Sequence, residues 1–378
     1  PMYVHVRSLG WLTSRGLVKG PLSLRLTGYA FGFGLVHGLL GGTVSLARWL
    51  DGLVYPTLEL APIPAPVFVL ATPRSGTTYL HQLLALDEER FASCRLYQTI
   101  VPSILLERAI DWLRGLRGPA GSVLGALVGA IDSRMFTDWD GIHRVSLSSW
   151  EEDESLFVYS LTSPALYLLF PFIREIPEFV EITRLGRRTI RRVASDYRQT
   201  VQRWVYTSGN QRTPLIKNVL LPSRLPVAAR AFPDARYVHV VRDPREAIPS
   251  AVSMFHTMWQ SHSPGIAADS PATRALADMF LTHYRLLCEE GRKQPPDRWI
   301  QVRYDDLIRD PIGTVERIYS AFGYSVGAEF RARLEQAAAQ GRSFKSRHQY
   351  ALEQFGLTEG DLREGLGEHW DGLRSASP

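Results

Sequence analysis

Apolar and polar positions along the chain follow a pattern that predicts strands alternating with helices. Residues 67–70 are all apolar and 236–241 form a second apolar, β-branched run, so both predict buried strands. Runs at 214–219 and 299–302 predict two further strands. Segments between and after these runs have helical periodicity. We expect helices at residues 77–86, 172–206, 247–258, 274–292 and 312–322, and a polar loop at 260–270.

This alternation predicts an α/β fold in which helices cover both faces of a central parallel sheet, a P-loop-like three-layer αβα arrangement. Ligands of such sheets bind beyond the carboxyl ends of the strands. With 378 residues, of which 45% are hydrophobic, the chain can bury a large core. We expect a helical N-terminal region over residues 1–60 and one domain with helical insertions over 61–378.

The segment between the first strand and its helix has the composition of a phosphate-binding loop. Residues 71–78 form a short loop with one glycine that ends at a helix N-terminus, where free N–H groups and the helix dipole favour an anion. Against the pattern G-x-x-x-x-G-K-[ST], Gly76 matches the second glycine, Thr77 replaces the lysine and Thr78 keeps the hydroxyl. The missing lysine argues against a nucleoside triphosphatase, and Arg74 becomes the main side-chain donor.

A second anion-binding group follows the strand at 236–241. Arg242 stands at the strand tip, Asp243 and Pro244 suit the first positions of a helix, and Ser250 lies two turns along that helix. An Arg-Asp pair at a strand end is by itself usually structural. Together with the first loop, however, this segment predicts a ligand whose two phosphate groups are held at separate places.

Three segments in this order resemble the sulfotransferases that use 3′-phosphoadenosine 5′-phosphosulfate (PAPS), in particular their large, mostly bacterial branch. Residues 302–307, followed by Asp310 and Pro311, resemble the family segment whose tyrosine lies near the adenine. The resemblance covers about residues 67–324 and implies a PAPS-dependent sulfotransferase. It implies a 5′-phosphosulfate loop with Arg74, Ser75, Gly76, Thr77 and Thr78, a 3′-phosphate pair of Arg242 and Ser250, and an adenine contact from Tyr304.

Sulfuryl transfer is an in-line displacement that resembles phosphoryl transfer, so positioned cations and N–H groups suffice and we expect no metal. Lys217, at the end of a predicted strand, is the expected cation at the leaving group, with a surface lysine as the alternative. The family pattern of a histidine followed by acids points to His143 and residues 151–154 as sources of a general base. From these we select His143 and Glu152.

Two nearby positions are expected not to serve as the base. Relatives often carry a glutamate where this chain has Gln98, and an amide cannot accept the proton. His239 alternates with Tyr237 along a predicted strand, so we interpret it as a core histidine whose hydrogen bonds are satisfied.

No sequence motif identifies the molecule that accepts the sulfuryl group. The resemblance implies that insertions, here mainly about 100–210 and 258–272, build the acceptor pocket. Apolar and aromatic residues favour a hydrophobic acceptor, a small molecule or a lipid, phenolic or steroid-like alcohol. Two other classes stay open: a P-loop-type kinase, and a non-catalytic protein that binds coenzyme A or another 3′-phosphoadenosine. The aromatic residues are Trp139, Trp150, Tyr159, Tyr167, Phe170 and Phe172.

Charge and cysteine content narrow the partners and the compartment. The net charge of +5 is mild, and the arginine cluster at 184–192 has helical spacing, so we expect a solvated helix face and no nucleic-acid partner. Cys94 and Cys288 match neither a disulfide framework nor a zinc motif, which favours a reducing compartment.

The N-terminal region contains a charge-free run at residues 26–47 that is long enough to cross a bilayer, although six glycines dilute its hydrophobicity. Basic residues precede it, as in a signal anchor, but that orientation would export the domain away from a cytosolic donor nucleotide. We therefore expect a helical hairpin that packs on the domain or lies in a membrane interface. The expected location is cytoplasmic, with residues 20–50 as the segment through which the protein would associate with a membrane.

Overall fold

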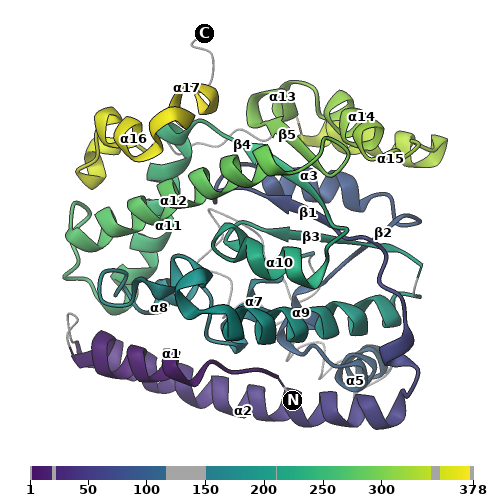
Figure 1. Cartoon of the computed structure of the whole chain (residues 1–378), viewed down its shortest axis with the longest axis horizontal. Helices are drawn as coiled ribbons and strands as arrows, with labels where there is room; N and C mark the ends of the chain where they lie inside the picture. Colours follow the sequence, from purple (N-terminus) through teal and green to yellow (C-terminus); the bar gives the residue numbers. More distant parts are fainter. Residues whose placement is uncertain (1, 19–22, 116–149, 210, 342–349, 375–378) are drawn as a thin grey trace.

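A computed structural model of the chain describes residues 2–18, 23–115, 150–209, 211–341 and 350–374. Within these residues the centre of the molecule is a five-stranded sheet with the strand order β2-β3-β1-β4-β5 (Figure 1), and every neighbouring pair is parallel. This confirms the predicted α/β fold with a central parallel sheet. The strands are β1 (Val67–Leu70), β2 (Phe91–Ser93), β3 (Thr213–Asn218), β4 (Arg236–Val241) and β5 (Trp299–Arg303).

Alternate side chains of β1 pack on opposite faces of the sheet. Val67 and Val69 belong to a buried cluster with α3 (Thr77–Ala85) and α14 (Pro311–Ala321). Phe68 and Leu70 belong to another cluster with α9 (Arg187–Thr207) and α10 (Leu225–Ala231). All four residues of the strand are buried, because helices cover both faces of a parallel sheet. The structure therefore has the predicted three layers (Figure 1).

Several predicted elements shift by only a few residues, but one start is wrong. The region predicted as a helix from residue 172 becomes the long helix α9 only at Arg187. Gly186 separates the two parts with a φ of 83°, which a glycine adopts without a side-chain clash. The helix predicted to end at residue 258 continues to His262, so the polar loop after it is shorter than expected. As predicted, an exposed face of α9 carries the arginine cluster, with Arg187, Arg188, Arg191 and Arg192.

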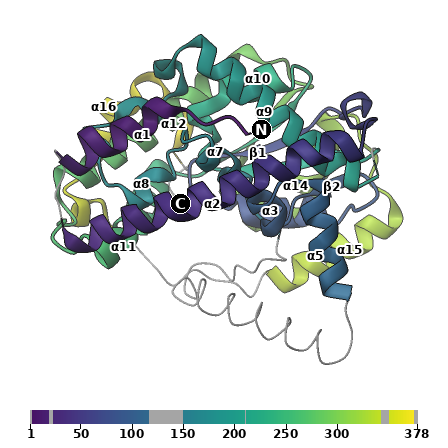
Figure 2. The same ribbon diagram turned by 90° about the horizontal axis from the view of Figure 1, so that it is seen from below.

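The N-terminal helices lie side by side along one side of the molecule, the lower edge in Figure 1. Figure 2, viewed from that side, shows α2 crossing the molecule. Leu12 and Leu26 are buried in a core cluster with residues of α8, α11 and α12, so this region packs on the domain. The predicted boundary at residue 60, between the helical N-terminal region and the domain that follows, stays a proposal. The remaining helices are α1 (Val6–Trp11), α2 (Leu24–Val54), α4 (Leu96–Ile100), α5 (Ile104–Gly115), α7 (Glu154–Tyr159), α8 (Leu166–Leu169), α11 (Pro244–His262), α12 (Pro271–Lys293), α13 (Tyr304–Arg309), α15 (Ala328–Gly341), α16 (Glu359–Leu366) and α17 (Trp370–Leu373).

The sheet order brings the predicted functional segments to one edge. The loop at 71–76 leaves β1, Lys217 and Asn218 end β3, Arg242 follows β4, and Tyr304 follows β5. Because the strands are parallel, their carboxyl ends meet at the same edge, where ligands of open α/β sheets bind. The candidate active site is built on this edge.

Candidate active site

The loop after β1 has a backbone conformation suited to an anion. Arg74 has a φ of 68° and Gly76 a φ of 81°, so the chain turns sharply before α3. The first N–H groups of a helix have no partner within the helix and face the loop. A Cβ at position 76 would lie 2.7 Å from Cδ2 of Tyr304, so the tyrosine ring packs directly against the glycine. The loop and the predicted adenine-contacting tyrosine are therefore neighbours.

Arg74 joins the two anion-binding segments. Its Nε donates to Oγ of Ser250 at 3.1 Å, and Nη1 of Arg242 donates to the Arg74 carbonyl oxygen at 2.7 Å. The Arg242 guanidinium also lies over the Tyr304 ring, 4.6 Å from its centroid. The structure thus brings together Arg74, Arg242, Ser250 and Tyr304. The resemblance assigned Arg74 to the 5′ side of the donor, whereas its side chain here lies with Ser250 and Arg242, the pair predicted to hold the 3′-phosphate.

This corner carries an excess of positive charge. Burial lowers the pKa of Arg74, and the nearby charge of Arg242 lowers it further. Arg242 pairs with Glu246 at 2.8 Å, but Arg74 forms no ion pair with any described residue. A phosphate group would supply the missing negative charge and accept hydrogen bonds from both arginines. These residues therefore fit a nucleotide with a phosphate at this end.

A second group of side chains surrounds Lys217 at the end of β3. Its Nζ donates to Oγ1 of Thr78 at 3.2 Å and lies 3.4 Å from Glu152 and 3.9 Å from Glu151. Only 3% of the Lys217 side chain is exposed, so the surface-lysine alternative is wrong. Because Thr78 lies in the first turn of α3, at the end of the predicted phosphate-binding segment, Lys217 connects that segment to two carboxylates.

The four consecutive acids divide into two pairs. Glu151 and Glu152 face Lys217, whereas Asp153 and Glu154 turn toward partners inside the protein. Asp153 accepts from Asn218 Nδ2 at 2.6 Å and from the hydroxyl of Tyr197. Glu154 pairs with the buried Arg224 at 2.5 Å. The prediction that only one or two of these acids face the crevice agrees with this geometry.

Burial raises the pKa of Glu152 to about 7, and the charges of Glu151 and Glu154 add to this effect while Lys217 opposes it. A carboxyl group of this pKa exchanges protons near neutral pH, as a general base requires. Burial also raises the pKa of Asp153 to about 6, although hydrogen bonds from Tyr197 and Asn218 hold its charged form. Since Asp153 is occupied by those two partners, Glu152 is the better candidate.

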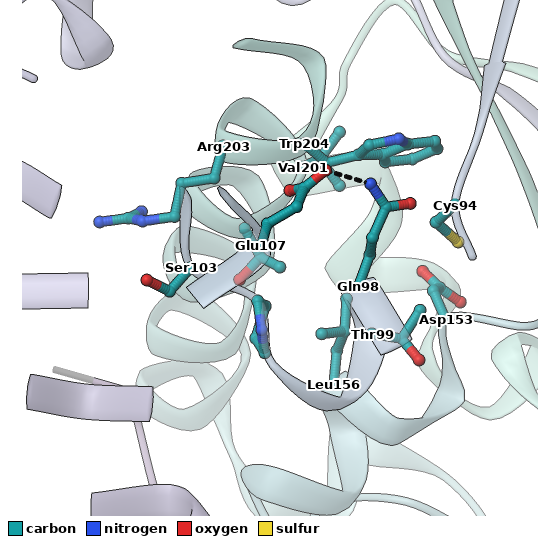
Figure 3. A pocket seen from close by; sticks show the side chains of 12 residues that line it. Cys94, Gln98, Thr99, Ser103, Glu107, Asp153, Leu156, Val201, Arg203 and Trp204 are labelled. Atoms are coloured by element: carbon teal, nitrogen blue, oxygen red, sulfur yellow. Dashed lines mark hydrogen bonds between the residues drawn. The ribbon is translucent and has the colours of Figure 1, made fainter. Parts of the chain in front are cut away.

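Gln98 lies in a separate small cavity next to the acidic segment (Figure 3). Its Nε2 donates to Oε1 of Glu107, and its Oε1 accepts from the backbone N–H of Arg95 at the start of α4. The cavity has a volume of about 20 Å³, which holds about one water molecule. Burial raises the pKa of Glu107. The amide of Gln98 is thus held by structural contacts, in line with the expectation that it is not the base.

Other predicted residues fall outside the site or outside the described residues. His143, Trp139 and the apolar run at 118–131 lie outside the described residues. His239 is buried, as expected, and burial lowers its pKa to about 3. Neither ring nitrogen has a hydrogen-bond partner among the described residues, so the expectation that its hydrogen bonds are satisfied is wrong. Tyr167, Phe170 and Phe172 pack in a core cluster, so they do not support a hydrophobic acceptor pocket.

Sequence reasoning missed Tyr284, whose hydroxyl donates to the Arg242 carbonyl oxygen at 2.8 Å and so holds the end of β4. The helical periodicity of residues 274–292 could have placed Tyr284 on the buried face, but no motif marks its role. Glu151 was within the predicted acidic run but was not selected.

Comparisons with known proteins agree with this geometry. A profile of the sulfotransferase family matches residues 66–327. The chain is 26% identical over 309 residues to the omega-hydroxy-beta-dihydromenaquinone-9 sulfotransferase Stf3 of Mycobacterium tuberculosis, a match that covers 81% of this chain and 73% of the relative. A 98-residue segment is 31% identical to mouse carbohydrate sulfotransferase 5, covering 23% of this chain and 25% of that protein.

Two solved structures share the fold. The sulfotransferase STF1 of Mycobacterium tuberculosis superposes with a TM-score of 0.72 at 20% identity, covering 96% of this chain and 91% of that chain. STF9 of Mycobacterium avium superposes with a TM-score of 0.69 at 19% identity, covering 86% and 81%. The family profile spans most of the sequence and contains the loop after β1, Lys217, Arg242 and Tyr304. The chain belongs to the sulfotransferase family.

Proposed function

We propose that this sulfotransferase moves a sulfuryl group from 3′-phosphoadenosine 5′-phosphosulfate to a hydroxyl group of a hydrophobic, lipid-like acceptor. The observation that carries the proposal is the arrangement of two separate cationic groups around one loop. Arg74 and Arg242 lie at one end of residues 74–78, and Lys217 contacts the other end through Thr78. A donor with a 3′-phosphate and a 5′-phosphosulfate would need such a pair.

Each group has a distinct task in binding the donor. Arg242 and Ser250 would hold the 3′-phosphate, and the Tyr304 ring would lie against the adenine. The N–H groups of residues 75–78, at the start of α3, would hold the 5′ end. The hydrogen bond from Tyr284 to the Arg242 carbonyl oxygen keeps the end of β4 in place for this contact.

When bound, PAPS supplies an activated sulfuryl group on a phosphate leaving group. Lys217 would neutralise the charge that develops on that leaving group, since it is buried and already contacts the loop hydroxyl of Thr78. Glu152 would accept the proton of the acceptor hydroxyl, and its raised pKa lets it both take up and release that proton near neutral pH. His143 is the second proposed base.

The hydrophobic acceptor is supported by a relative and not by an identified pocket. The Stf3 relative is named for a hydroxylated menaquinone, and the match with it covers 81% of this chain. We therefore propose an alcohol on an apolar chain or ring, and a cytoplasmic location where donor nucleotide and lipid acceptor meet.

Transfer of sulfur-35 from labelled PAPS tests the proposal. We expect label in hydroxylated isoprenoid quinones or other lipid alcohols, and none in the methyl ethers of the same compounds. Lys217→Ala should abolish most of the transfer. Lys293→Ala is the matched control, because this lysine is 66% exposed on α12. Transfer of phosphate from labelled ATP in place of sulfate would overturn the proposal.

A further inference from the structure

The exposed apolar residues of this protein are concentrated in one region. Among the described residues, all but two of the large exposed apolar side chains lie between Val4 and Leu60, the exceptions being Trp112 and Ile308. Most belong to α2. A surface patch of this extent on a soluble protein marks a site of contact with a partner or a membrane.

The outer side of α2 is an apolar stripe. Its members are spaced three, four or seven residues apart, and such spacing places them on one face of a helix. Each side chain in this outer stripe is more than half exposed. The residues are Phe31 (76%), Leu35 (54%), Leu39 (64%), Leu46 (59%), Trp49 (56%) and Leu53 (62%).

The opposite side of α2 carries two of the three charged residues of this helix. Arg48 is 3% exposed and pairs with Asp196 at 2.8 Å, and Asp51 is fully buried and pairs with Arg203 at 3.1 Å. Asp51 also accepts from the hydroxyl of Ser103 at 3.0 Å. A surface helix in water normally turns its apolar side inward and its charged side outward. The charges of Arg48 and Asp51 point inward, whereas the apolar stripe points outward and the third charged residue of α2, Arg25, is exposed near its start. The outer side therefore suits an apolar medium bordered by a basic group.

Contacts along its whole length hold α2 against the domain. At its start Oγ of Ser23 donates to the carbonyl oxygen of His262 at 2.9 Å. In the middle Nε2 of His37 lies 3.0 Å from the carbonyl oxygen of Tyr159. Near its end are the two ion pairs of Arg48 and Asp51. By length and composition alone α2 could cross a membrane, but crossing would break these contacts with the domain.

The charges around the outer stripe favour an anionic surface. Arg25 of α2 and Arg7 of α1 are exposed, whereas Asp51 is buried and Glu59 is the exposed acid among the described residues up to 60. Basic side chains next to an apolar helix face are attracted to anionic lipid headgroups.

We propose that α2 is an in-plane membrane anchor that lies flat on an anionic phospholipid bilayer with its outer stripe in the lipid. The domain stays on one side of the membrane, held by the ion pairs of Arg48 and Asp51. His37 of α2 contacts Tyr159, the last residue of α7, and α7 follows directly on Glu152 and Asp153. Docking through α2 therefore brings the acidic segment near the membrane surface. This inference does not depend on the proposed donor or acceptor.

Flotation of the full chain with phospholipid vesicles tests the anchor. We expect the protein to float with vesicles that contain phosphatidylglycerol and to bind pure phosphatidylcholine less well. The triple variant Leu35→Gln, Leu39→Gln, Leu46→Gln should lower the partition coefficient by at least about tenfold, because three side chains lose their lipid contact. Ile308→Gln is the control, since it removes an exposed apolar side chain outside this region.

Glutamine is a good helix former, and the three positions are exposed, so the triple variant should keep the wild-type circular dichroism spectrum. Vesicle binding by the triple variant at the wild-type level would overturn the proposal. The proposal would also be overturned if the wild-type protein did not bind vesicles. This holds whether the protein sediments as a monomer or as a dimer that the triple variant disrupts. A helix that spans the membrane would place the chain before residue 24 inside sealed vesicles, where added protease could not cleave it. Such protection would also overturn the proposal of an in-plane anchor.

Discussion

Arg242 and Ser250 lie on different parts of one strand–helix unit, and Arg74 links them through its carbonyl oxygen and its Nε. If this corner binds the 3′-phosphate, Arg242→Ala should weaken binding of 3′-phosphoadenosine 5′-phosphate by about 1.5–3 kcal/mol, since a charged donor is lost. Ser250→Ala should cost less, about 0.5–1.5 kcal/mol, because it removes a neutral hydroxyl. Titration calorimetry on both variants measures the difference.

Arg245→Ala is the matched control for this pair. Arg245 is the next arginine along the chain and pairs with Asp243 at 2.7 Å. Its loss should leave nucleotide affinity near the wild-type value. Wild-type affinity in both Arg242→Ala and Ser250→Ala would show that the phosphate binds elsewhere.

The ionisation of Glu152 should control the acid limb of the pH profile. Its pKa is raised to about 7 mainly by burial, so the native protein keeps the proton that the unfolded chain releases near the ordinary glutamate value. The contribution to stability is therefore complete at low pH and is lost as the pH rises through about 7. Activity should change in the opposite direction, because a base must be deprotonated: kcat/KM should increase as the pH rises through about 7.

Glu152→Gln should lower kcat by about 10²–10⁴-fold and remove that limb, with nucleotide affinity little changed. His143→Ala, measured beside it, decides between the two proposed bases, since only one of them should show a loss of this size. Near-wild-type turnover in both variants, with intact circular dichroism, would assign the base to another group.

At the scale of elements, the loop and the start of α13 form one unit because the Tyr304 ring lies against Gly76. Gly76→Ala should displace this ring and also strain a backbone with a φ of 81°. The strain costs about 1–2 kcal/mol of stability, and loss of the ring position should weaken nucleotide binding as well. Chemical denaturation and calorimetry measure the two effects separately.

Gly323→Ala is the control that separates the effect of backbone strain from the effect of displacing the Tyr304 ring. Gly323 has a φ of 69°, but no atom lies within 4 Å of the position that its Cβ would take. This variant should lose stability to a similar extent and keep its nucleotide affinity. Equal nucleotide affinities in the two variants would argue against a role of the Tyr304 ring in binding.

The structure also shows which elements local sequence signals could predict. The strand, loop and helix at residues 67–85 were predictable because apolar runs, one glycine and hydroxyl residues each act over a few positions. The division of residues 151–154 was not, since it depends on Asn218 and Arg224, which reach the acids only in the folded chain. The inward charges of α2 were equally hidden, because their partners Asp196 and Arg203 lie far along the sequence.

At the scale of the whole molecule, the order of the strands assembles the site. Placing β1 between β3 and β4 brings Arg74, Lys217 and Arg242 to one edge, although 168 positions separate the first from the last. The sequence predicted this edge, since parallel strands end together. It did not place Arg74 at Ser250, because a long side chain can turn toward either end of its loop. The acceptor site was not predictable either, because the insertions that we propose form it have no local signal in the sequence.

Ligand-dependent thermal stability tests the central claim most directly. At a hundred times its dissociation constant a ligand adds about 2.7 kcal/mol to the free energy of unfolding. We predict that 3′-phosphoadenosine 5′-phosphate raises the Tm of the wild-type protein strongly, raises that of Arg242→Ala much less, and exceeds ATP with magnesium in both. Stronger stabilisation by ATP with magnesium, or by coenzyme A, would contradict a PAPS-dependent sulfotransferase and support the kinase or the coenzyme A binding protein instead.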